Sequence, residues 1–282
     1  MSHFVHVRRM YREMMERQGM LRHEWIAILF FAHVAVAALV RRRIPPGQRA
    51  TAGVGALVAA AGVFAIARTA SLSVRDWTPI ASILAGYYLS GRTFFAPNPR
   101  IESWLASVDR RMLGDPPFFS RWPAAIVRIL DAAYIGCFLL VPAGLGLLFA
   151  AGHRDQSDLY WTIVVSAELG AFAALPYLQT RPPWVLERIA EQREGTRRRA
   201  SVVFMQRATT GANTLPSGHA AGSLAVALAV VGTLPVAGVV LLGLAIAISV
   251  GAVVTRAHFV VDIASGLALA GLVWCLVRIY GG

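Results

Sequence analysis

Two histidines and an aspartate in the last quarter of the sequence have the types and spacing that nucleophilic and acid–base chemistry requires. In the stretch HFVVD, His258 and Asp262 are four residues apart, so on a helix they lie on the same side, one turn from each other. A carboxylate in that position can hold one imidazole nitrogen and leave the other as a base or a nucleophile. His219, in the earlier stretch PSGH, can donate a proton to a leaving oxygen. We therefore expect these three residues to form a catalytic group.

Four further residues have the chemistry of a phosphate-binding site. The PSGH stretch is expected to begin a helix, and the free N–H groups at a helix N-terminus attract anions. Ser217 adds a hydroxyl donor there, and Gly218 lets a phosphate oxygen approach the backbone. Arg181 and Arg256 supply planar, permanently charged donors that match phosphate oxygens. Zinc is disfavoured because no cysteine or third histidine is near the two histidines, and neither a metal nor a cofactor is expected.

These residues can meet only if the segments that carry them return to one end of the molecule. The composition, 56% hydrophobic and 15% charged over 282 residues, is too apolar for a soluble domain. Apolar runs of about 20 residues, long enough to cross a ~30 Å hydrocarbon layer as helices, recur along the chain. The expected crossings lie near residues 24–40, 50–68, 77–91, 124–151, 159–178, 219–235, 236–255 and 258–278. We predict an all-α polytopic membrane bundle of six to eight transmembrane helices.

The spacing of the polar clusters predicts that they share one membrane face. His219 and His258 are 39 residues apart, about two membrane spans of 20 residues, so the chain returns to the face that it left. Arg181, in the stretch QTRPPW, follows the preceding crossing at that same face. Three separate polar clusters therefore converge, which favours a common site.

Amphipathic segments distinguish the N-terminal part of the chain. Residues 4–23 carry apolar positions near helical spacing with arginines between them, which fits either a basic helix on an anionic membrane surface or a solvated tail. Residues 99–113 predict a second interfacial helix, with an apolar stripe that includes Trp104 and Met112. We divide the chain into N-terminal amphipathic and membrane helices, residues 1–123, and a catalytic membrane core, residues 124–282.

The motifs RPP, PSGH and HxxxD, in this order and with these spacings, resemble those of the type 2 phosphatidic acid phosphatase superfamily. The resemblance covers roughly residues 124–278 and implies a metal-independent enzyme with a helical-bundle core. It implies that His258 attacks phosphorus and forms a phosphohistidine, that Asp262 orients this histidine, and that His219 protonates the leaving group. The phosphate would be held by other residues of the motifs, namely Arg181, Ser217 and Gly218.

Two positions depart from the pattern of that superfamily. The first motif usually has a lysine where this chain has Ala174, and the third usually has an arginine where it has Ala252. We interpret Arg256, two residues before His258, as a replacement for the lost charge. The stretch TRAHFVVD then resembles the branch that contains inositol phosphorylceramide synthases and related bacterial phosphotransferase-like proteins.

The residues and the resemblance together predict an integral membrane phosphatase or phosphotransferase. Its substrate would be a membrane lipid phosphate or diphosphate, with water or an alcohol as the acceptor. The alternative is a non-enzymatic transporter or scaffold that binds an anionic lipid headgroup. The pairing of His258 with Asp262 favours the enzyme, because anion binding alone would need only the arginines.

Charge bears on partners and on orientation. The net charge of +12 comes from arginines scattered through the loops, which disfavours nucleic-acid binding. Their distribution alone puts the active face in the cytoplasm. The basic N-terminus, which prefers the cytoplasmic leaflet, puts that face outside if the number of crossings is even, and the resemblance agrees. We expect a bacterial inner-membrane protein with an extracytoplasmic site. The sequence gives no oligomeric state.

Overall fold

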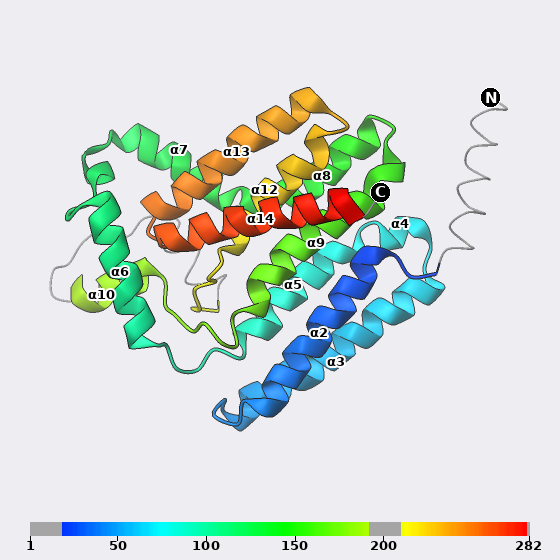
Figure 1. Ribbon diagram of the computed structural model, residues 1–282, viewed down its shortest axis with the longest axis horizontal. Helices are drawn as coiled ribbons and strands as arrows, with labels where there is room; N and C mark the ends of the chain where they lie inside the picture. Colours follow the sequence, from blue (N-terminus) through cyan, green and yellow to red (C-terminus); the bar gives the residue numbers. More distant parts are fainter. Residues whose placement is uncertain (1–18, 192–209, 281–282) are drawn as a thin grey trace.

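The computed structural model describes residues 19–191 and 210–280, which form a bundle of α-helices (Figure 1). In chain order the helices are α2 (Arg22–Val40), α3 (Pro46–Thr69), α4 (Leu72–Arg75), α5 (Thr78–Gly91), α6 (Pro99–Leu113), α7 (Ala124–Ile135), α8 (Cys137–Ala150), α9 (Ser157–Ala173), α10 (Pro183–Glu191), α12 (Gly218–Val231), α13 (Pro235–Val254) and α14 (Val260–Tyr280). Short 3-10 helices cover Phe118–Arg121 and Arg154–Gln156. The described residues contain no strand, so the all-α prediction is confirmed.

Four of the described helices, α2, α3, α13 and α14, are long and apolar enough to cross a membrane. Helices α7 and α8 form a fifth candidate, as a pair bent by 61°. All eight predicted runs are helical, but α5, α9 and α12 have only 14, 17 and 14 residues. The chain is therefore a helical membrane protein, and the count of six to eight crossings stays a prediction.

The apolar run at 124–151, predicted as one crossing, is two helices in the structure. Helix α7 ends at Ile135 and α8 begins at Cys137, and the 61° bend lies at Gly136 between them. Glycine is a poor helix former, and Pro142 further weakens the hydrogen-bond ladder inside α8. An apolar run alone does not show such a break, because the residues around it stay hydrophobic.

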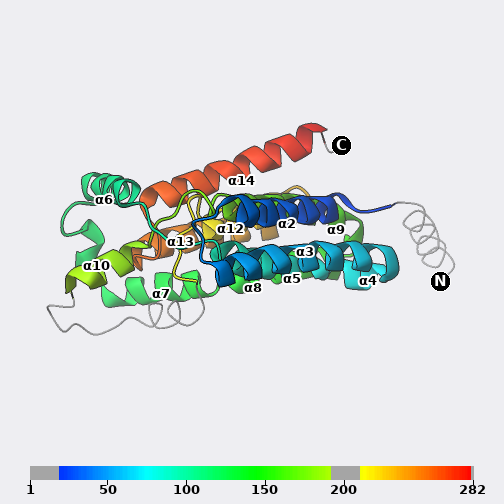
Figure 2. The same ribbon diagram turned by 90° about the horizontal axis from the view of Figure 1, so that it is seen from below.

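Helix α12 lies at the centre of the C-terminal half and packs against α8, α9, α13 and α14. Figure 1 shows it between α9 and α13, with α14 crossing over it, and Figure 2 places α14 along one edge of the molecule. The buried positions of α12 are mostly glycine, alanine and serine. Small residues let membrane helices approach each other closely. This packing fixes the position of the PSGH stretch, since α12 begins at Gly218.

Helix α6 has the bounds predicted for the interfacial helix. Trp104 and Met112 of the predicted stripe are 53% and 60% exposed. The residues that α6 buries are Glu102, Leu105, Asp109 and Leu113. In both views α6 lies with α10 and the α13–α14 connection at one end of the molecule, left in each (Figures 1 and 2). The other amphipathic segment, 4–23, lies mostly outside the described residues.

Gly266 of α14 packs closely against the start of α12. A Cβ at this position would lie 2.5 Å from the carbonyl oxygen of Ser217 and 3.2 Å from the Cβ of Ala220. On the same helix, a Cβ at Gly271 would meet no atom within 4 Å. Backbone cannot move aside as a flexible side chain does, so Gly266 keeps the two helices at the distance that the site requires.

We expect Gly266→Ala to destabilise the protein by about 1–3 kcal/mol, the usual effect of overpacking. Gly271→Ala is the matched control, and it should be neutral or stabilising by up to ~1 kcal/mol because alanine is the better helix former. Thermal unfolding of both purified variants in the same detergent checks this. Equal midpoints for the two variants would contradict the close contact at Gly266.

Candidate active site

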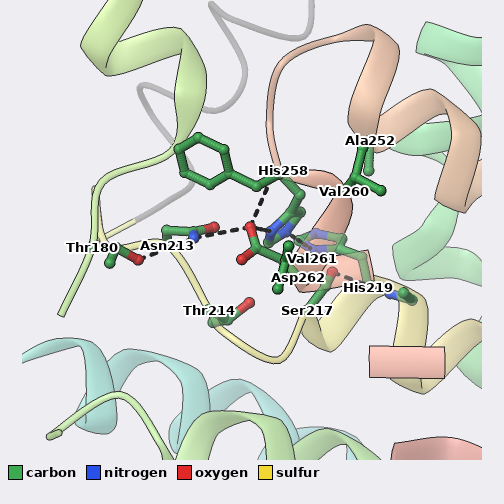
Figure 3. Close-up of polar contacts among 12 residues, drawn as sticks. Thr180, Asn213, Thr214, Ser217, His219, Ala252, His258, Val260, Val261 and Asp262 are labelled. Carbon is green, nitrogen blue, oxygen red and sulfur yellow. Dashed lines mark hydrogen bonds and ion pairs between the residues drawn. The ribbon is translucent and has the colours of Figure 1, made fainter. Parts of the chain in front are cut away.

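His258, Asp262 and His219 come together between the start of α14 and the start of α12 (Figure 3). Nδ1 of His258 lies 3.4 Å from Oδ2 of Asp262, and Nε2 lies 3.3 Å from Nδ1 of His219. His258 is 3% exposed and Asp262 is fully buried, whereas His219 is half-buried. The structure thus brings together the three residues predicted to form the catalytic group.

The pairing of His258 with Asp262 arises at a helix start rather than within one helical turn. Helix α14 begins at Val260, so His258 precedes it, while Asp262 lies in its first turn. Oδ2 of Asp262 accepts a hydrogen bond from the backbone N–H of Phe259 at 2.8 Å, as a carboxylate at a helix N-terminus commonly does. A carboxylate can only accept, so Nδ1 of His258 is the donor in this contact. In the neutral imidazole the lone pair is then on Nε2, which faces His219.

The N-terminus of α12 faces this pair and uses most of its own donors. Ser217 is the N-cap; its hydroxyl accepts from the Ala220 N–H at 3.4 Å, and its own N–H donates to the Asp262 carbonyl at 2.9 Å. The Gly218 N–H donates to the Thr214 hydroxyl at 3.2 Å. Among the described residues, no acceptor binds the N–H of His219. One amide of the first turn thus remains available to an anion.

Gly218 has a packing role that the sequence did not indicate. A Cβ there would lie 2.6 Å from the Phe172 ring and 3.3 Å from Oε2 of Glu168, both on α9. A Cβ at Gly222, one turn later, would lie 1.8 Å from Oε1 of Glu168. The two glycines therefore admit the Glu168 carboxyl group against the first turns of α12.

Arg181 is held by a carboxylate of α6. Its Nε and Nη2 bind Oε1 and Oε2 of Glu102 at 3.0 and 2.8 Å, and its backbone N–H donates to Oε1 at 2.8 Å. Burial would raise the pKa of Glu102, but the hydrogen bonds and charge of Arg181 outweigh it and hold this pKa below its usual value. Nη1 of Arg181 has no acceptor within the described parts of the chain. The Arg181 side chain is 32% exposed, so its guanidinium can bind an anion through the outer edge.

Arg256 lies beside the site but binds two carboxylates. Its Nε is 2.6 Å from Oε1 of Glu187 on α10, and its Nη1 is 2.7 Å from Oδ2 of Asp109 on α6. Burial would lower the pKa of Arg256, but Glu187 and Asp109 outweigh it and raise this pKa above the ordinary value. Asp109 also accepts from the Val260 N–H, which starts α14. Arg256 thus ties α6 and α10 to the segment that carries His258.

The backbone of Arg256 is itself unusual. It has φ of +61°, in the left-handed region that costs a non-glycine residue roughly 1–3 kcal/mol. Its carbonyl accepts from the Trp184 N–H at 2.9 Å. This hydrogen bond and the two ion pairs of Arg256 hold the connection between α13 and α14 in one conformation.

The sequence model of the PAP2 superfamily matches residues 103–276, more than half of the chain, including all three motifs. The chain belongs to the PAP2 superfamily. Its membership supports phosphatase or phosphotransferase activity on a phosphate ester, and confirms the superfamily resemblance, while the sub-branch stays a prediction. No curated protein and no solved structure gives a significant match.

In this PAP2 superfamily member, the two departures from the motif pattern lie at backbone-packing positions. Ala252 is fully buried, and its carbonyl accepts from the N–H groups of Ala257 and His258 at 2.9 and 3.1 Å. It packs in an apolar cluster with Tyr134 and Ile263. Ala174 ends α9. Residues 19–191 and 210–280 contain no group of three or more His, Cys, Asp or Glu arranged to hold a metal ion.

The structure adds polar residues that the motifs did not indicate. Thr180 and Asn213 form an antiparallel bridge that joins the Arg181 segment to the PSGH segment, and Asn213 reaches Asp262 (Figure 3). Glu102 and Asp109, seven residues apart on α6, bind the two arginines. In the sequence, Asn213 could be seen as a polar residue just before PSGH in an apolar chain. Its contacts with Thr180 and Asp262 could not be seen there.

Proposed function

We propose that this protein is a membrane enzyme that takes the phosphoryl group from a lipid phosphate or diphosphate onto His258 and passes it to water or an alcohol. The observation that carries the proposal is the environment of His258. One nitrogen faces the Asp262 carboxylate, the other faces His219, and the N-terminus of α12 is adjacent. A site that only bound anions would not need a buried carboxylate behind the imidazole.

In the first step, Nε2 of His258 attacks phosphorus and the bond between phosphorus and the lipid oxygen breaks. The phosphoryl group enters by displacing the His219 ring from Nε2, which leaves His219 beside the departing oxygen. His219 enters this step as an imidazolium, donates one proton to that oxygen and becomes a neutral imidazole. The lipid alcohol, or the lipid monophosphate where the substrate is a diphosphate, departs. Asp262 stabilises the positive charge that develops on the His258 ring.

In the second step, His219 accepts a proton from water or from an acceptor alcohol, whose oxygen attacks the phosphohistidine. The phosphorus–nitrogen bond breaks and inorganic phosphate or a new phosphate ester leaves. Both imidazoles return to their starting protonation states, so one catalytic cycle consumes only the substrate and the acceptor.

The phosphate oxygens would be held by donors around the imidazole pair. Arg181 offers its outer edge while Glu102 holds the inner one, and the N–H of His219 adds a backbone donor. Ser217 and Gly218 start the helix whose dipole favours the anion. Arg256 binds Glu187 and Asp109 through Nε and Nη1, so only its Nη2 has no acceptor among the described residues and could contribute without losing an ion pair.

A lipid substrate fits the position of the site at the end of the bundle. The exposed Trp104 and Met112 on α6 suit the interfacial layer of a bilayer, where a headgroup lies. We place this end at the extracytoplasmic face of a bacterial inner membrane. Labelling with a membrane-impermeant reagent at a cysteine introduced in place of Arg100, on the exposed start of α6, tests that side.

The proposed function is tested by phosphate release from purified protein in detergent. Phosphatidic acid and a prenyl diphosphate, each with excess EDTA and with or without an alcohol, should release phosphate or yield a new ester. Brief incubation with 32P-labelled substrate should leave acid-labile, alkali-stable label on the protein, as expected of a phosphorus–nitrogen bond. Tight lipid binding without turnover would favour a transporter or scaffold instead, and activity that needs added metal would contradict the mechanism.

A further inference from the structure

One oxygen of Asp262 carries all the hydrogen bonds of its carboxylate. Oδ2 accepts from Nδ2 of Asn213 at 3.0 Å, from the Phe259 N–H at 2.8 Å and from Nδ1 of His258 at 3.4 Å (Figure 3). Oδ1 is buried and has no partner among the described residues. The direction of the carboxylate therefore depends on the donors gathered at Oδ2, because nothing in the described chain holds the other oxygen.

Of the donors to Oδ2, two are side chains, His258 and Asn213. The amide of Asn213 is in turn held in place by Thr180. Asn213 is 1% exposed, and Nδ2 also donates to the hydroxyl of Thr180 at 3.1 Å. Its backbone N–H donates to the Thr180 carbonyl at 2.8 Å. Both amide hydrogens thus face acceptors, so the amide cannot turn over without losing two hydrogen bonds.

This geometry connects three segments that are distant in the sequence. Thr180 precedes Arg181, Asn213 precedes the PSGH stretch, and Asp262 faces His258. Figure 3 shows the connection running from Thr180 through Asn213 to Asp262 and His258. We infer that Asn213 is a positioning residue: it holds Asp262 so that Oδ2 points at Nδ1 of His258, with Thr180 orienting the amide.

The consequence for the reaction follows from the long contact between the carboxylate and the imidazole. At 3.4 Å the pair is near the outer limit of a hydrogen bond, so a small rotation of Asp262 breaks it. His258 would then lose both its orientation and the support for its developing charge. The inference rests on the proposed function, because it assigns Asn213 to the step in which His258 takes up phosphorus.

The test compares Asn213→Ala with Gln179→Ala as a matched control. Gln179 is a second buried amide in the same region, but it binds the Thr93 carbonyl and the N–H groups of Phe95 and Ala96. Both variants should lower the thermal midpoint. Only Asn213→Ala should slow single-turnover phosphoenzyme formation, by roughly 10- to 100-fold for the loss of a hydrogen bond to a charged group, with KM within about twofold of wild type.

A second pair of variants keeps the test decisive if Asn213→Ala fails to fold. Thr180→Val removes the acceptor that orients the amide, and Thr180→Ser retains it. We expect Thr180→Val to slow phosphoenzyme formation by about 5- to 10-fold, and Thr180→Ser to stay near wild type, since one neutral hydrogen bond is lost only in the first.

The outcomes separate this inference from the proposed function. A wild-type protein that never becomes labelled overturns the proposed function, and the inference with it. Labelled wild type together with an equally fast, folded Asn213→Ala or Thr180→Val overturns the inference alone. A slowed Gln179→Ala with an unchanged KM also overturns it, because the effect would then follow general destabilisation.

Discussion

Replacement of His258 by alanine is expected to abolish both phosphate release and phosphoenzyme labelling. His219 is 3.3 Å away, but its imidazole makes no contact with the Asp262 carboxylate and cannot take over the role of nucleophile. The protein should still fold. Asp262 keeps the hydrogen bonds from Phe259 and Asn213, so the free energy of unfolding should fall by only about 1–2 kcal/mol.

The measurement is phosphate release from a short-chain lipid phosphate, with the 32P label followed in parallel. His153→Ala is the control: it removes an imidazole that lies in the connection between α8 and α9 and should retain full turnover. His219→Ala should be slow on alkyl esters but much faster on an aryl phosphate, whose leaving group needs no proton. Full turnover by folded His258→Ala would overturn the mechanism.

Local chemistry made the catalytic group predictable. The four-residue spacing of His258 and Asp262 is a property of the chain itself, and the 39 residues between the two histidines match two membrane crossings. His258 and Asp262 still meet although α14 begins only at Val260, because Oδ2 of Asp262 accepts a hydrogen bond from the Phe259 N–H before the helix. The superfamily match confirmed the resemblance drawn from the same motifs.

The residues around that group could not be predicted because they depend on which way α6 turns. Its apolar stripe, which includes Trp104 and Met112, predicted an interfacial helix but did not show what the polar side of that helix would contact. At a bilayer, apolar side chains can face lipid while the polar face turns inward. Glu102 and Asp109 are consequently 4% and 3% exposed, and each binds an arginine.

The same reasoning applies to Asn213 and to the division of the chain. Nothing in the spacing of Asn213 indicates a contact with Asp262, because that contact needs the bridge to Thr180 and the packing of α12 on α14. Helix α6 lies within the region predicted as N-terminal, 1–123, yet its carboxylates reach the site. The boundary at 123 stays a prediction.

Loss of Arg181 should have the largest effect of any cation, slowing kcat/KM on a short-chain substrate by on the order of 100- to 1,000-fold. Its Nη1 has no acceptor among the described residues, so in the proposed mechanism its outer edge binds a phosphate oxygen in the transition state. Arg181→Lys should recover little, because an ammonium cannot hold Glu102 and present a second edge at once. Near wild-type turnover by Arg181→Ala would remove it from the site.

Arg256→Ala is expected to reduce turnover whether Arg256 ties the helices together or binds phosphate. Only the first role predicts that turnover and stability are lost together. As a tie between helices, Arg256 leaves Asp109 buried and unpaired when it is removed, which costs about 3–5 kcal/mol. The double variant Arg256→Ala/Asp109→Asn removes that charge, while an asparagine oxygen can still accept from the Val260 N–H. Its thermal midpoint should therefore recover.

If turnover recovers with it, Arg256 acts through α6 and α14; if turnover stays about 100-fold low in a stable protein, Arg256 is a phosphate ligand. The two carboxylates already bound to its guanidinium favour the first outcome.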